Sequence, residues 1–345
     1  MVTMRTRGRQ AGAALLLALL IMTLVATLAA GMVWLQWRGI EVEAAERARA
    51  QAQWLLNASL DWGNLILKAS IRNTHTEDDL GQPWATPLAE TKLSSFLSAD
   101  GNHTDEGGPE AYLSGQITDA AGKYNIYNIL LNPLNPGPNV KFDEINRLKI
   151  ICTAIGVSPD TADTIGAGLR ESWSAQQNAS AGAGTGGQSG NSVLMPIEVS
   201  DLVWYGIDPK VIKQLEPFIQ ILPAPAGSTV TNINLNTAPA EVLMAAMPGL
   251  TRAQAQQLIL ARQQNPFKKV ADATTALGIA AAAGWTPPQG SPPTQMDVVS
   301  NYFEIYGQLR YEQHVIRERS VVQRAGPFDP IKVLRRERVP LDAAA

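Results

Sequence analysis

The sequence has few of the residues that most often build reactive or cross-linked sites. It contains one cysteine, Cys152, which excludes an intrachain disulfide and a cysteine-only metal site. Its three histidines, His75, His103 and His314, are far apart and lack the spacing of metal ligands. No Ser/His/Asp or Cys/His motif is evident. We therefore predict that the chain is not an enzyme, and we assign no catalytic residue.

A strong charge of either sign is also missing. The 345 residues include 28 lysines and arginines against 31 aspartates and glutamates, a formal net charge of -3. This balance lacks the excess of positive charge that is typical of proteins that bind nucleic acid. The length is enough for about two folded domains.

Charged residues are absent from one long stretch near the N-terminus. Ala13 to Trp37 is an uncharged, mainly apolar run of 25 residues, and as a helix it would span about 37 Å, more than the roughly 30 Å core of a bilayer. Arginines precede the run and glutamates follow it, so the positive-inside rule places the N-terminus in the cytoplasm and the bulk of the chain outside. We predict a single membrane span.

The residues before this span favour cleavage on its cytoplasmic side. A short basic leader that ends in Gly12, followed by an apolar helix from Ala13, resembles the leader of type IV pilins and pseudopilins. The resemblance implies that the prepilin peptidase removes the leader and methylates the new N-terminus. Most members carry glutamate at the fifth mature position, where this chain has Leu17. The alternative is an ordinary secretory signal, cleaved near Ala29 or Ala30.

An amphipathic pattern continues beyond the apolar run. Apolar residues recur mostly at three- and four-residue intervals, which is typical of a helix with one packed stripe. We predict one continuous helix from Ala13 to Lys68, whose outer half packs on a globular head; the alternative is a simple stalk. The stripe comprises Val42, Ala45, Ala52, Leu55, Leu56, Leu60 and Leu65.

Alternating apolar and polar residues predict two antiparallel hairpins. In the first, Leu113 to Ile117 and Tyr124 to Ile126 flank the turn residues 119–122. In the second, Phe303 to Tyr311 and His314 to Gln323 flank a turn at residues 312–313. The sheet would therefore have parts far apart in the sequence.

The residues between these hairpins predict helices. One helix carries Phe142, Ile145, Leu148, Ile151 and Ile155; a second follows Ser158 and Pro159; and a third begins at Asp208 and Pro209. The Gly/Ser-rich stretch from Ser174 to Ser192 has too little apolar surface to fold, and we interpret it as a disordered loop.

Residues 233–267 resemble a DNA-binding helix-hairpin-helix motif. Thr237 is predicted to cap a first helix, and Thr251 with Gln254 to form a capping box for a second. Thr251 replaces the glycine that lets hairpin amides approach a phosphate. In the stretch from Asn232 to Asp272, the basic residues exceed the acidic residues by only two: Arg252, Arg262, Lys268 and Lys269 against Glu241 and Asp272. We therefore interpret the motif as a structural module that does not bind nucleic acid.

Two groups of acidic residues raise the question of a cation. The stretch "DGNHTDEGG", residues 100–108, has alternating oxygen donors but lacks the glycine and glutamate placement of an EF-hand. We interpret it as a solvated loop. We likewise do not interpret Asp78, Asp79 and Asp119 as metal ligands. No metal ligand is assigned.

The order of these features resembles the general secretion pathway protein K family, the largest minor pseudopilins of type II secretion systems. The resemblance covers nearly the whole chain and includes the leader, "GQPWATPL", "ITDAAGKYNIYNIL", "VSDLVWYGIDPKVIKQLEPFIQILP", "NINLNTAPAEVLMAAMPG" and "SNYFEIYGQLRY". It implies an α+β fold: a pilin-like body, with a long transmembrane helix packed on an antiparallel sheet, and a large all-helical inserted domain. Calcium is associated with the family, but the resemblance does not identify its ligands here.

The implied domain organisation follows the chain in order. Residues 1–12 are the leader, 13–37 the transmembrane helix, 38–124 the first part of the body, 125–295 the insert with two SAM-like or helix-hairpin-helix modules, and 296–345 the C-terminal strands and tail.

The implied function is to cap or initiate the tip of the periplasmic pseudopilus, together with minor pseudopilins I and J. The chain would be anchored in the inner membrane, would meet the prepilin peptidase and other inner-membrane secretion components, and would support export of folded proteins across the outer membrane. Two alternatives remain open: a type IV pilus or competence pilin that binds DNA through the helix-hairpin-helix motif, and a membrane-tethered enzyme.

Overall fold

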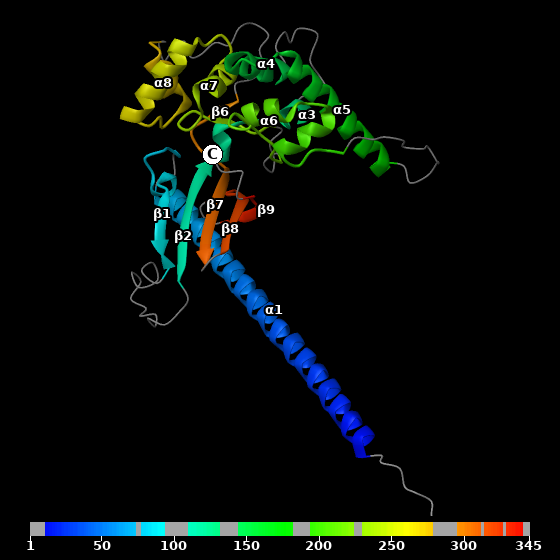
Figure 1. Ribbon diagram of the computed structural model, residues 1–345. Coiled ribbons are helices and arrows are strands. Elements are labelled where there is room, and N and C mark those ends of the chain that lie inside the picture. The colour runs from blue at the N-terminus through cyan, green and yellow to red at the C-terminus, as the bar shows by residue number, and fades with distance from the viewer. Residues whose placement is uncertain are drawn as a thin grey trace, which may run out of the picture. The chain divides into compact units, whose positions relative to one another are not determined.

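A computed structural model describes residues 11–73, 77–93, 110–131, 144–181, 194–223, 230–278, 295–311, 314–326 and 329–340. The chain divides into two compact units, one ending at Asn57 and the other beginning at Ala58. One helix, α1 (Ala11–Asn73), contributes to both units (Figure 1). This confirms the predicted continuous helix and extends it at both ends.

The first unit is the N-terminal part of α1. Its large apolar side chains from Leu15 to Val42 are exposed, because nothing in the described part of the chain covers them. The hydroxyls of Thr23 and Thr27 donate to carbonyls three residues earlier, Leu20 and Leu24, at 2.9 Å. The helix therefore satisfies these two hydroxyls with its own backbone.

The second half of α1 buries one face. Leu60, Gly63, Leu67 and Ser70 are buried and recur every three or four residues. Leu65, which we predicted to lie on this face, is 63% exposed. The prediction was wrong there because five residues of α-helix rotate Leu65 by about 140° from Leu60. Of the other predicted stripe residues, Ala52 and Leu56 are buried and Val42 is exposed.

The body of the second unit is a five-stranded antiparallel sheet in the order β1-β2-β7-β8-β9 (Figure 1). Its strands are β1 (Leu88–Lys92), β2 (Ala111–Asp119), β7 (Tyr302–Tyr311), β8 (His314–Gln323) and β9 (Lys332–Arg338). The predicted pairing of Phe303 to Tyr311 with His314 to Gln323 is confirmed.

The other predicted hairpin does not form. The chain leaves β2 through a short 3₁₀ turn, η2 (Ala120–Gly122), and β3 (Tyr124–Asn125) pairs in parallel with β4 (Ile219–Gln220). The Asp119 carboxylate accepts a hydrogen bond from Ala121 N at 2.8 Å and so caps this turn. The turn directs the chain out of the sheet instead of back along it, and β2 pairs with β1 and β7.

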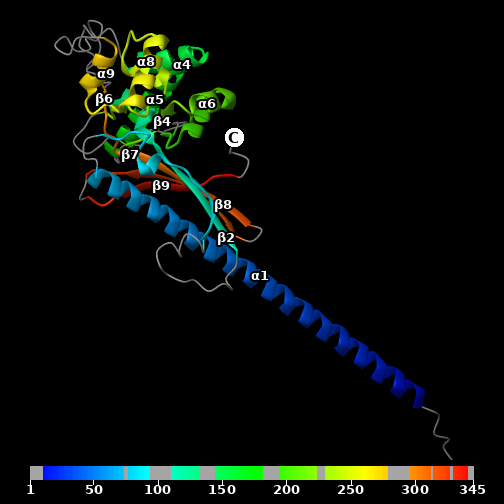
Figure 2. The same cartoon turned by 90° about the vertical axis from the view of Figure 1, so that its left-hand side faces the viewer.

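One apolar core joins α1 to the sheet. Trp84, in the 3₁₀ turn η1 (Pro83–Ala85), meets Phe303 edge to face with ring centroids 5.2 Å apart. Figure 2 shows the last turns of α1 along the strands. The buried members of this core are Leu60, Leu67, Trp84, Ile117, Phe303, Ile305 and Val322. Phe303 and Ile305, which the alternation placed on one face of their strand, both belong to this core.

Between β2 and β7 the chain builds an insert that consists mainly of helices. These are α3 (Asn128–Leu131), α4 (Glu144–Ile155), α5 (Asp160–Ala181), η3 (Val199–Tyr205), α6 (Pro209–Leu215), α7 (Ala240–Ala246), α8 (Arg252–Gln264) and α9 (Val270–Ala276). All of them contribute to one apolar core, and Figure 2 shows them gathered in one group. The insert also contains β3-β4 and a second parallel pair, β5 (Ile233–Asn234) with β6 (Met296–Asp297), so it is not all-helical.

Local capping residues explain several helix boundaries. Asp208 caps α6 by accepting from Lys210 N at 2.8 Å, and Thr251 and Gln254 form the predicted capping box of α8. Helix α5 continues to Ala181, so the tract that we predicted to be disordered begins as helix; its residues 182–192 lie outside the described part of the chain.

Candidate functional site

Two features stand out as candidate sites: the exposed apolar part of α1 and a buried polar junction in the second unit. In α1, the Leu17 side chain is 63% exposed, and its neighbours Leu15, Leu16, Leu19 and Leu20 are exposed as well. Ala13 and Gly12 both lie within the first turns of the helix. By length and composition, the helix is a candidate single-pass membrane anchor.

The first turn of α1 contains no acidic residue. Leu17 offers only van der Waals contact, so this part of the helix can pack against lipid tails or other apolar helices but cannot pair with an ammonium group. The predicted cleavage between Gly12 and Ala13 remains a prediction.

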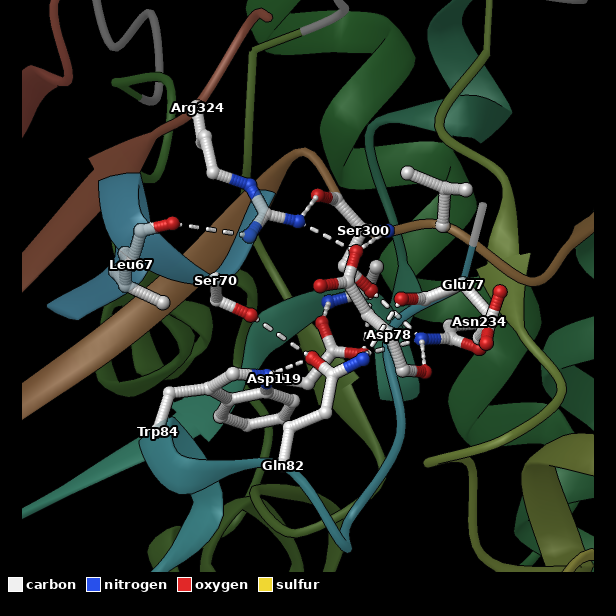
Figure 3. A network of polar contacts seen from close by, with 12 residues as sticks. Leu67, Ser70, Glu77, Asp78, Gln82, Trp84, Asp119, Asn234, Ser300 and Arg324 are labelled. Atoms are coloured by element: carbon white, nitrogen blue, oxygen red, sulfur yellow. Dashed lines mark hydrogen bonds and ion pairs between the residues drawn. The ribbon is translucent and has the colours of Figure 1, made fainter. Parts of the chain in front are cut away.

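The polar junction centres on the carboxylate of Asp119, at the end of β2 (Figure 3). One carboxylate oxygen accepts from the Asn234 amide at 2.9 Å, the Thr237 hydroxyl at 2.5 Å and the Ser300 hydroxyl at 2.5 Å. The other accepts from Ala121 N. Burial raises the pKa of Asp119 to about 6, although its bonds to Ser300 and Thr237 act in the opposite direction.

A second carboxylate, Asp78, extends the junction to α1. It accepts hydrogen bonds from Ser300 N at 2.8 Å and from the Arg324 guanidinium. Arg324 also donates to the carbonyls of Leu67 at 3.3 Å and Ser300 at 3.0 Å, and it stacks 4.6 Å from the Phe303 ring centroid. Both members of this ion pair are almost fully buried.

Neighbouring side chains complete the junction. The Asn234 amide donates to the Ser300 hydroxyl at 2.8 Å and to the Asp78 carbonyl at 3.0 Å. Gln82 accepts from Trp84 at 2.6 Å and from Ser70 at 3.0 Å. Since nearly every polar atom has a partner, the arrangement can hold segments together but offers no free nucleophile or base.

The junction does not resemble a cation site. Asp78 and Asp119 come together, but protein donors bind Asp78 Oδ2 and both carboxylate oxygens of Asp119. The Asp79 carboxylate accepts from Gly81 N in its own loop. Within the described ranges, no group of three or more His, Cys, Asp or Glu residues could hold a metal ion. The stretch 100–108, His75, His103 and the His314 side chain lie outside what the structure describes.

Sequence reasoning missed most of this junction. Thr237 was predicted to cap a helix, but α7 begins at Ala240 after Pro239, and the Thr237 hydroxyl binds Asp119 instead. Asn234, Ser300 and Arg324 were not singled out. The only available signal was their polarity beside apolar strand residues, which does not reveal a partner that is distant in the sequence.

The helix-turn-helix formed by α7 and α8 uses two of its basic residues internally. Arg252 pairs with Glu241. Arg262 is buried and donates to the carbonyls of Leu235 and Ala238 at 2.7 Å, and burial lowers its pKa to about 10. The Arg262 guanidinium is therefore not available to a phosphate, whereas the Arg252 side chain is exposed beside Glu241.

Comparisons with known proteins agree with these features. The family model for protein K of the type II secretion system matches residues 233–290, which include α7, α8 and α9. A type II secretion system protein K from Pectobacterium carotovorum subsp. carotovorum is 27% identical over 96% of this chain and 97% of its own length. Another, from Pseudomonas aeruginosa, is 26% identical over 78% of this chain and 77% of its own.

The fold has a counterpart among solved structures. A chain in the crystal structure of the GspK-GspI-GspJ complex of the enterotoxigenic Escherichia coli type 2 secretion system aligns over 86% of this chain and 98% of its own, with a TM-score of 0.55 and 19% sequence identity. Over most of its length the chain is thus similar to proteins of the type II secretion system protein K family.

Proposed function

We propose that this chain is a minor pseudopilin that caps or initiates the tip of the type II secretion pseudopilus and so supports export of folded proteins across the outer membrane. Helix α1 carries the proposal: one uninterrupted helix is exposed and apolar at its start and packs on an antiparallel sheet at its end. Such a helix can join a membrane or a helical filament while it holds a folded head outside.

Leu17 supports a place at the tip. In a growing filament, a glutamate at this position can pair with the terminal ammonium of the subunit above and thereby offset the cost of a charge in the membrane. A topmost subunit has no subunit above it, so leucine is tolerated there. The insert between β2 and β7 also adds bulk that a subunit repeated along a filament would have to accommodate.

The remaining parts of the proposal concern processing, topology and partners. We propose that the prepilin peptidase cleaves between Gly12 and Ala13 and methylates Ala13, and that the chain crosses the inner membrane once with its N-terminus in the cytoplasm. We propose minor pseudopilins I and J as partners, because the structurally similar chain was solved in a complex with GspI and GspJ. The domain boundaries at residues 12, 37, 124 and 295 belong to the same proposal.

The DNA-binding alternative has less support. Of the basic residues in the motif, Arg252 pairs with Glu241 and Arg262 is buried. No observation in the described ranges favours a nucleic acid over a protein partner.

The direct test of function is complementation. A host strain that lacks its own copy of this gene should lose export of its type II substrates and regain it when the full chain is supplied. Co-purification from membranes should recover pseudopilins I and J with the chain. Normal export in the deletion strain, or complementation without any associated pseudopilin, would contradict the proposal.

A further inference from the structure

The helical insert is connected to the sheet by two necks. The chain leaves the sheet at Asp119, the last residue of β2, and returns through residues 298–301 to β7. Two-neck inserts have few covalent constraints on their orientation, and relative motion is the default unless the interface is large or specifically fixed. The question is what fixes the orientation here.

The two necks are bound directly to each other. The Ser300 hydroxyl, in the returning neck, donates to the Asp119 carboxylate, in the departing neck, at 2.5 Å. These residues are 181 positions apart in the sequence. This bond closes the base of the insert.

A third segment, from the middle of the insert, binds both necks. Asn234 lies in β5, which pairs with β6 just before the returning neck. Its amide donates to Asp119 at 2.9 Å and to Ser300 at 2.8 Å. Thr237, three residues later, donates to the same carboxylate oxygen at 2.5 Å. The insert is therefore anchored by its interior as well as by its ends.

The departing neck also approaches this segment very closely. A Cβ added to Gly122 would lie 2.9 Å from the Thr237 hydroxyl and 3.3 Å from its carbonyl carbon. Glycine at this position allows the close contact between η2 and the turn after β5. The methyl group of an alanine at position 122 would push these two segments apart without removing any hydrogen-bonding side chain.

Other contacts between insert and sheet are smaller or more exposed. Arg319, on β8, lies 3.7 Å from Glu198 and 3.9 Å from Glu216 of the insert, and both glutamates are partly exposed. Exposed ion pairs of this kind contribute at most about 1 kcal/mol each. Leu222 packs with Tyr302 and Val321, and Tyr302 donates to the Pro223 carbonyl at 2.8 Å. These contacts join the insert to the sheet in addition to the buried bonds of the two necks.

We propose that Asp119 and Asn234 are positioning residues that clamp the two necks and fix the orientation of the helical insert on the sheet. Asp78 and Arg324 extend the clamp to the Leu67 carbonyl, so the insert keeps its angle to the last turns of α1 as well. The consequence for secretion rests on the proposed function: a tip subunit must present its insert at a fixed angle to its partners.

The test measures orientation separately from folding. Nitroxide labels are attached to cysteines introduced at exposed Ala89 on β1 and exposed Gln263 on α8 of the full-length protein in detergent. The parent protein controls for labelling of the buried Cys152. Double electron-electron resonance then gives the distribution of distances between the labels, and circular dichroism gives the Tm.

Gly122→Ala and Asn234→Ala should each shift this distribution or add a second population, while helical content is retained. Gly39→Ala is the matched control, since a Cβ there meets nothing within 4 Å, and it should leave the distribution unchanged. Unchanged distance distributions in both Gly122→Ala and Asn234→Ala would overturn the proposal. A shift in Arg319→Met but in neither of these two variants would also overturn it.

Export by the same variants tests the functional consequence. A variant with a shifted distribution and a normal amount of protein in the membrane should lose most of its ability to restore export. Full export by such a variant would show that export does not require a fixed orientation of the insert. Failure of the unmodified chain to restore export would instead contradict the proposed function. The distance measurement would still test whether Asp119 and Asn234 fix the orientation of the insert.

Discussion

The hydroxyl of Ser300 and the carboxylate of Asp119 form a 2.5 Å hydrogen bond that joins the points where the chain enters and leaves its sheet. Ser300 Oγ also accepts from the Asn234 amide at 2.8 Å, so this one hydroxyl serves three segments. Since the site is fully buried, no water can replace the hydroxyl without rearrangement.

Replacing Ser300 by alanine should therefore destabilise the protein. The change removes the hydrogen bond to the buried Asp119 carboxylate and the one from the Asn234 amide, and a hydrogen bond to a charged group typically contributes about 1.5 to 3 kcal/mol. Urea unfolding of the detergent-solubilised chain, followed by tryptophan fluorescence, measures the effect. The control is Ser174→Ala, which removes an exposed bond to the Glu171 carbonyl within α5. Equal stability of the two variants would contradict the role assigned to Ser300.

The pKa of Asp119 predicts a pH dependence. Its value rises from 3.8 to about 6 in the folded protein because the carboxyl is buried. Between these values the folded state keeps a proton that the unfolded state has lost, so stability should fall as pH rises from about 4 to about 6, by on the order of 3 kcal/mol, and then level off.

The comparison variant is Asp119→Asn, which does not titrate. Burial also raises the pKa of Glu144, which adds a slope of the same sign to both proteins, so the difference between their unfolding free energies across pH 4 to 7 isolates Asp119. Parallel curves for the two proteins would show that folding does not shift the pKa of Asp119, and would contradict the prediction.

Arg324 should be the most costly of the junction residues to replace. Arg324→Met removes the partner of buried Asp78, and breaking a buried ion pair in this way costs about 3 to 5 kcal/mol. Adding Asp78→Asn should recover part of that loss, because it removes the unpaired charge. Arg310→Met is the control: this arginine pairs with Glu90 at 2.7 Å and lies 4.1 Å from the Tyr112 ring centroid while 41% exposed, and its loss should cost no more than about 2 kcal/mol.

Processing can be tested on protein extracted from membranes. The basic leader that ends in Gly12 predicts a mature N-terminus at Ala13, carrying a methyl group. N-terminal sequencing and intact mass measure both. A mature chain that begins at Ala30 or Gly31 would identify an ordinary secretory signal and remove the basis for the pilin-like interpretation.

Patterns along the chain predicted the elements that depend on near neighbours. The period of apolar residues predicted α1, alternation predicted the β7-β8 pairing, and cap chemistry predicted the starts of α6 and α8. In each case the decisive contacts are a few residues apart or lie on one face of one element.

Features that depend on distant contacts were missed. The residues of β3 have the alternation of a hairpin strand, but Tyr124 N donates to the Phe218 carbonyl, so tertiary pairing overrode the local pattern. Asp78 and Ser300 are bonded across 222 positions. No local pattern marks such a pair, because each residue alone is a common surface residue near a turn.

The central claim is that the chain occupies the tip of the pseudopilus, and its position in assembled filaments tests this most directly. Pseudopili assembled with full-length chain carrying an epitope after Ala345 can be labelled with immunogold. The account predicts label at one end of each filament, in roughly single copy, because Leu17 and the insert prevent a further subunit from adding above. Label distributed along the filament length would contradict the tip role.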